Sequence, residues 1–81
     1  MLKQYDEVDL VNDLMSDDLI GKPILLKAGQ KGQIMEIYDS PKGFDVEFFD
    51  KSGKTVAVMI VKEKNLKFVQ KGLTETSREV A

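Results

Sequence analysis

The sequence predicts an all-β fold, an SH3-like five-stranded antiparallel barrel with a long first loop and a short helical turn before the last strand. Runs with the two-residue alternation of β-strands follow one another closely between residues 26 and 69. Clusters of Gly, Pro, Asp and Ser separate these runs, as hairpin turns do. The alternative, an OB-type barrel, needs a helix of two or three turns between its third and fourth strands, and no segment there fits one.

The first strand is expected at residues 5–11, where Val8 and Leu10 alternate with acidic residues. Residues 12–25 are expected to form a long loop with at most a short helix, which Asn12 could cap. Pro23 prevents a longer helix. Glycines at 29 and 32 are expected to bracket a turn or bulge that leads into the second strand.

The other four strands are expected at residues 32–39, 44–50, 54–61 and 66–69. In the third strand, Phe44, Val46 and Phe48 share one side, which is typical of a core face. The fourth strand is apolar on both faces. We expect Val58 in the core and Met59 on the outside, where the long loop, the tail or another molecule must cover it. The barrel then spans residues 1–69, and a flexible C-terminal tail spans residues 70–81.

Composition excludes several kinds of chemistry. The 81 residues suit one domain with one small core. The absence of Cys and His excludes disulfides, thiolate catalysis, Cys/His zinc sites and imidazole acid–base chemistry. No cofactor or metal is expected. No run reaches the roughly 18 apolar residues of a membrane span, and no secretory signal is visible, so a cytoplasmic protein without a membrane segment is expected.

Charge is unevenly distributed along the chain. The net charge is −2, yet residues 1–20 carry −5 and residues 21–81 carry +3. Two interpretations remain open. The acidic segment could pack over the lysine-bearing barrel, or it could form a face that attracts a basic partner.

The chain contains a set of short motifs: Tyr5-Asp6 with Val8 and Leu10, Asp13-Leu14, the turn glycines 29 and 32, Ile34-Met35-Glu36-Ile37-Tyr38, Val46-Glu47-Phe48, and Asp50 followed by Gly53-Lys54-Thr55 and Ala57. Together these motifs resemble a family of small bacterial proteins of unknown function that have an SH3-like fold. The resemblance covers residues 5–69. It departs from the family at Met15, where proline is usual. It implies an accessory or toxin-neighbourhood protein that is not an enzyme.

Catalysis and nucleic-acid binding fit the residues poorly. Asp50, Lys54 and Thr55 could be drawn as acid, base and nucleophile, but exposed turn residues lack the desolvation that such roles require. Nucleic-acid binding is the alternative function, and it would use Lys62, Lys64 and Lys67. A negative net charge, a single arginine and few exposed aromatic side chains make nucleic acid an unlikely ligand.

The sequence therefore predicts a non-catalytic protein-interaction module, acting as an accessory subunit, as a toxin-neutralising partner or by self-association. An apolar patch on the outside of so small a barrel is typical of an interface. The predicted contact residues are Tyr38, Phe49 and Met59, helped by the acidic residues Asp13, Asp17 and Asp18. These three aspartates lack the ligand spacing of an EF-hand, so no calcium site is expected there.

Overall fold

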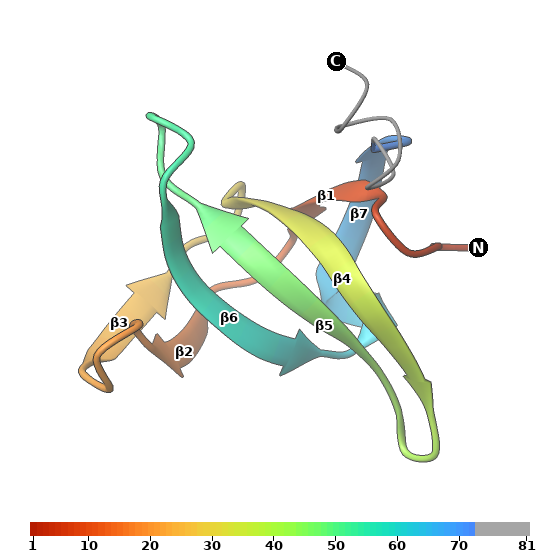
Figure 1. Ribbon diagram of the computed structural model, residues 1–81, viewed down its shortest axis with the longest axis horizontal. Helices are drawn as coiled ribbons and strands as arrows, with labels where there is room; N and C mark the ends of the chain where they lie inside the picture. The colour runs from red at the N-terminus through yellow and green to blue at the C-terminus, as the bar shows by residue number, and fades with distance from the viewer. Residues whose placement is uncertain (73–81) are drawn as a thin grey trace.

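The computed structural model describes residues 1–72, which form seven strands and one turn of 3-10 helix (Figure 1). The predicted tail lies outside the described residues from position 73 onward. The elements in chain order are β1 (Glu7–Leu10), β2 (Leu14–Asp17), β3 (Pro23–Leu26), β4 (Lys31–Asp39), β5 (Lys42–Phe49), β6 (Thr55–Val61), the 3-10 helix (Glu63–Asn65) and β7 (Leu66–Gln70).

The strands form two antiparallel sheets, as the all-β prediction requires. The larger sheet has five strands in the order β6-β5-β4-β1-β7, and β2 pairs with β3 in a separate hairpin. The long strand β4 connects the two halves of the larger sheet, because its first residues pair with β1 while its whole length pairs with β5. In the described residues β6 and β7 do not pair with each other, so they form the two edges of this sheet.

Residues 12–25 form a β-hairpin, so the prediction of a loop with at most a short helix was wrong. The Asp13 carboxylate accepts a hydrogen bond from the Ala28 amide at 2.8 Å and so closes the base of the hairpin. At the tip, the Asp18 carboxylate accepts from the amides of Ile20 and Lys22 at 3.0 and 2.9 Å. Short polar side chains of this kind serve turns as well as helix caps, and here they stabilise the turn.

The core lies between the inner face of the larger sheet and the inward side of the hairpin. Phe44, Val46 and Phe48 are fully buried, as predicted. The other buried apolar residues are Leu2, Val8, Leu10, Leu26, Ile34, Ala57, Val61 and Leu66. The hairpin contributes Leu14 and Ile24, which pack against this cluster.

The two glycines before the second predicted strand serve different purposes. Gly29 has a φ of +92°, a left-handed conformation that a turn requires and that side chains disfavour. Gly32 lies within β4, where an added Cβ would approach Cγ1 of Val46 to 2.7 Å. Gly32 therefore allows close packing of β4 over the core, whereas the predicted bulge lies further along β4, between Ile34 and Glu36.

The prediction for the two faces of β6 was wrong. The register pairs Val46 with Met59, so Met59 points to the core side, while Val58 lies opposite Glu47 on the outer side. Val58 is 46% exposed and Ile60 is 63% exposed. When both faces of a strand are apolar, the sequence does not show which face points to the core. In the folded chain, the register shift between Phe48 and Phe49 decides which residues of β6 face inward. Within residues 1–72 no helix has the length and apolar character needed to cross a membrane.

Candidate protein-interaction surface

A shallow groove of about 530 Å³ lies between the β2–β3 hairpin and the edge strand β6. Figure 1 shows β2 lying beside β6 at this side of the molecule. We call it the hairpin groove, and its lining residues are Met15, Ser16, Asp17, Asp18, Pro23, Val58 and Met59.

The hairpin wall follows from the alternation of β2 and β3. Leu14 lies opposite Leu26 on the inward side, next to the core. The neighbouring pair, Met15 and Leu25, therefore points outward, and Met15 is 62% exposed. Leu19 and Ile20 at the tip are also exposed. The hairpin thus uses one face to complete the core and presents apolar side chains to solvent on the other.

The β6 wall combines apolar side chains with neighbouring carboxylates. Val58 lies opposite Glu47, and Ile60 lies opposite Asp45, all on the outer face of the sheet. The Thr55 hydroxyl donates a hydrogen bond to the Glu47 carboxylate at 2.6 Å. No hydrogen bond or ion pair holds the Asp45 side chain within residues 1–72. An exposed apolar strip therefore runs beside at least one carboxylate that is available to a partner.

The acidic N-terminal segment is mostly satisfied by contacts within the protein. Five of its acids accept hydrogen bonds: Asp6 from the Lys3 amide, Glu7 from the Gln70 side chain, Asp9 from the Lys31 ammonium, Asp13 from the Ala28 amide, and Asp18 from two amides of the hairpin tip. Among the described residues no such partner holds the Asp17 side chain, which lines the hairpin groove. Contacts within the fold therefore account for most of the acidic segment, and Asp17 is the exception among its described carboxylates.

The structure brings together three of the six predicted contact residues. Met59, Asp17 and Asp18 all line the hairpin groove, although Met59 reaches it from the core side of β6. Asp13 lies at the base of the hairpin, where its carboxylate has a structural role. Tyr38 is exposed near the far end of β4, opposite Gly43.

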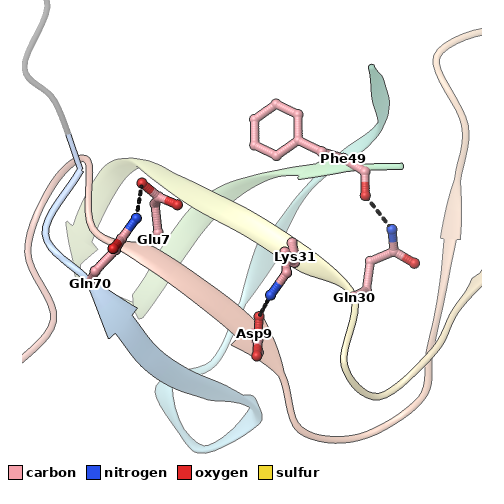
Figure 2. A network of polar contacts seen from close by, with 6 residues as sticks. All are labelled: Glu7, Asp9, Gln30, Lys31, Phe49 and Gln70. Atoms are coloured by element: carbon pink, nitrogen blue, oxygen red, sulfur yellow. Dashed lines mark hydrogen bonds and ion pairs between the residues drawn. The ribbon is translucent and has the colours of Figure 1, made fainter. Parts of the chain in front are cut away.

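Phe49 lies at a second pocket, away from the hairpin groove. The Gln30 side-chain amide donates a hydrogen bond to the Phe49 carbonyl, and Figure 2 shows the Phe49 ring directed away from Gln30. Lysines 27, 31 and 51 also line this pocket. The Lys31 ammonium lies 3.3 Å from the Asp9 carboxylate, an exposed ion pair that Figure 2 also shows.

The three lysines of the alternative function lie near the 3-10 helix and β7. Lys62 precedes that helix, Lys64 lies within it, and both are exposed. Lys67 lies on β7 directly opposite Asp9. Glu63, between the first two lysines, forms an ion pair with Lys42 at 3.2 Å. Carboxylates therefore interrupt this group of cations, which lowers its attraction for phosphate.

Asp50 is the titratable group whose surroundings shift its pKa clearly within the described region. A hydrogen bond from the Ser52 hydroxyl lowers the pKa of Asp50, helped by the Lys54 amide. Asp50 is thus an ionised turn residue, and a general base near neutral pH needs a raised pKa instead. Nowhere in residues 1–72 do three Asp, Glu, His or Cys side chains gather as ligands for a metal ion.

Sequence reasoning missed the apolar outer side of the hairpin. Met15, which lines the groove, and the exposed Leu19, Ile20 and Leu25 are not among the predicted contact residues, because the sequence predicts a loop over residues 12–25. The available signal was a second apolar run, residues 24–26, at a spacing from residues 14 and 15 that allows a hairpin.

A comparison with known families gives a match over most of the chain. A family described as a domain of unknown function (DUF4926) matches residues 4–68. No curated protein and no solved structure matches the sequence or the fold. The chain belongs to the DUF4926 family, which agrees with the expectation of a family of unknown function over residues 5–69.

Proposed function

This protein belongs to a family of unknown function, and we propose that it is a non-catalytic protein-interaction module. It binds its partner through the hairpin groove. The observation that carries the proposal is the exposure of apolar side chains on both walls of one groove. Met15 lies on the hairpin wall and Val58 on the β6 wall, and both are about half exposed or more. Apolar surface that converges in this way is typical of an interface.

The chemistry of the groove favours a protein over a nucleic acid. Asp17 and Asp18 lie in the groove and would repel phosphate groups. A polypeptide can instead cover Met15 and Val58 with apolar side chains and meet the carboxylates with Lys or Arg. The groove is also wide open to solvent, whereas a small molecule usually binds in a pocket that encloses it.

The finer fold assignment belongs to the same proposal. The chain order of a first strand, a hairpin, three meandering strands, a 3-10 turn and a last strand supports an SH3-like barrel, in which β4 pairs with both β1 and β5. An accessory subunit or a toxin-neutralising protein of the bacterial cytoplasm fits a small module of this kind.

Site-specific photo-crosslinking tests the proposal. A photoreactive amino acid replaces Met15 in the groove or, as a control, Ser52 in the exposed β5–β6 turn. In cells of the source organism we expect a discrete crosslinked protein from position 15 and none from position 52. A second copy of the chain in that product would identify self-association. Equal crosslinking from both positions, or none from position 15, would contradict the proposal.

A further inference from the structure

We propose that the open edge of β6 accepts an extended segment of the partner as an additional antiparallel or parallel strand, and that this segment alternates apolar residues with Lys or Arg. This inference rests on the proposed function and specifies the partner's chemistry. It combines three features of one side of the molecule: an unprotected strand edge, the adjoining hairpin groove, and carboxylates on both sides of the strand.

The two edges of the larger sheet differ in protection. Strand β7 carries Lys67, and a register shift interrupts its pairing with β1. Charged side chains and bulges are the usual means by which proteins block an edge. Strand β6 has the sequence TVAVMIV, without charge or proline, and its register with β5 is unbroken from Ala57 to Val61. The register shift between β5 and β6 lies at the start of β6, before Ala57, so from Ala57 to Val61 this edge lacks the features that prevent strand addition.

The hairpin lies beside β6 but does not pair with it. Strand β2 pairs only with β3 in the described residues, and the hairpin groove opens where β2 approaches β6. The backbone groups on the open side of β6 therefore have no strand partner among residues 1–72. An incoming segment could satisfy these groups with its own backbone while its side chains enter the groove.

Charge selects a basic segment over a second copy of β6. Asp17 and Asp18 line the groove, and Asp45 and Glu47 lie on the neighbouring strand β5, on the outer face of the sheet. The lysines nearest in sequence, at positions 22, 54 and 62, lie at the hairpin tip and beyond the ends of β6. A second β6 would cover the groove carboxylates without supplying a cation, which carries a desolvation cost. Lys or Arg side chains would offset that cost.

The alternation follows from the faces of β6. Partner residues on the outer face would lie beside Val58 and Ile60. Long cationic side chains at these positions could reach across β6 to Glu47 and Asp45 on β5. Partner residues on the inner face would lie beside Met59, which favours Val, Ile or Leu. The predicted partner segment is about five to seven residues long, the usual length of a strand.

Synthetic peptides test strand addition directly. The probe is a seven-residue peptide of alternating Lys and Val with blocked ends, and calorimetry or fluorescence anisotropy measures its Kd. Two further peptides carry N-methyl groups on the Lys residues or on the Val residues. A strand added at one edge donates only its alternate amides to β6. We expect one methylated peptide to lose about tenfold or more in affinity and the other to bind nearly as the parent does.

Three outcomes would overturn the inference: no binding of the parent peptide, equal effects of the two methylation patterns, or equal binding of a Glu/Val peptide. Crosslinking from position 15 together with any of these results would leave the proposed function intact and refute only strand addition. A dimer of this protein that forms through β6 would also overturn the inference, because the occupant of the edge would then be a second copy of the chain.

Charge variants complete the test. Asp17→Asn and Asp45→Asn each remove a carboxylate that has no partner among the described residues. We expect several-fold weaker binding of the Lys/Val peptide at low salt, and a smaller difference at high salt. Asp9→Asn is the matched control, because its carboxylate binds Lys31 on the opposite half of the sheet. An equal loss in Asp9→Asn would point to net charge alone and contradict the inference.

Discussion

Truncation of Phe48 and truncation of Val58 are expected to have very different effects on stability. Phe48 is 0% exposed in the middle of the core, so Phe48→Ala removes a whole buried ring and leaves a cavity. Such substitutions cost about 3 to 5 kcal/mol in the free energy of unfolding. Val58 is 46% exposed on the outer face of β6. At about 0.8 kcal/mol for each buried methyl group, Val58→Ala should cost only about 0.5 to 1 kcal/mol.

Urea unfolding followed by circular dichroism measures both values, with the slope of the transition as a check on two-state behaviour. A small domain could lose its fold altogether when Phe48 becomes alanine. Phe48→Leu therefore provides a milder variant that should still be less stable than Val58→Ala. A loss at Val58 as large as that at Phe48 would show that Val58 faces the core, and would refute the register that exposes the β6 wall.

Three further predictions concern packing and turns. Gly32→Ala should cost about 1 to 3 kcal/mol, because the new methyl group would crowd Val46; an unchanged urea midpoint would contradict this contact. The Ser52 hydroxyl lowers the pKa of Asp50, so this carboxylate stabilises the turn above its usual pKa and loses the effect as pH falls through the lowered value. The urea midpoint of Asp50→Asn should therefore lie below that of the wild type at pH 7 and converge with it below about pH 4, whereas a constant difference would contradict the assignment. Asp13→Ala should accelerate hydrogen exchange in the β2–β3 hairpin and cost about 1 kcal/mol, because a backbone amide loses its acceptor; unchanged exchange there would contradict a closing role.

Much of the fold was predictable from local pattern. The strict alternation of Phe44, Val46 and Phe48 with polar residues determines which face of β5 is buried, and the structure confirms it. Turn residues at 39–43 and 50–53 likewise predict two hairpins. These elements need only the two-residue period and turn chemistry, which a sequence shows directly.

The candidate site was harder to predict, because it depends on which face of β6 points outward and on contacts between residues far apart in the sequence. In β6 every residue after Thr55 is apolar, so only pairing with β5 decides that Val58 faces outward. In residues 12–25, a polar turn with aspartates is compatible with either a helix cap or a hairpin tip. The hydrogen bond from Ala28 to Asp13 spans 15 positions and selects the hairpin, and a local pattern does not reveal it.

The NMR spectrum of the ¹⁵N-labelled protein, titrated with the Lys/Val peptide, tests most directly whether the hairpin groove and the β6 edge form the binding surface. We predict that the largest amide shifts fall in residues 14–25 and 55–61, and that amides near Phe49, at positions 27–31 and 50–53, change little. Shifts centred on the Phe49 pocket, with β6 unaffected, would contradict the assignment of the interaction surface.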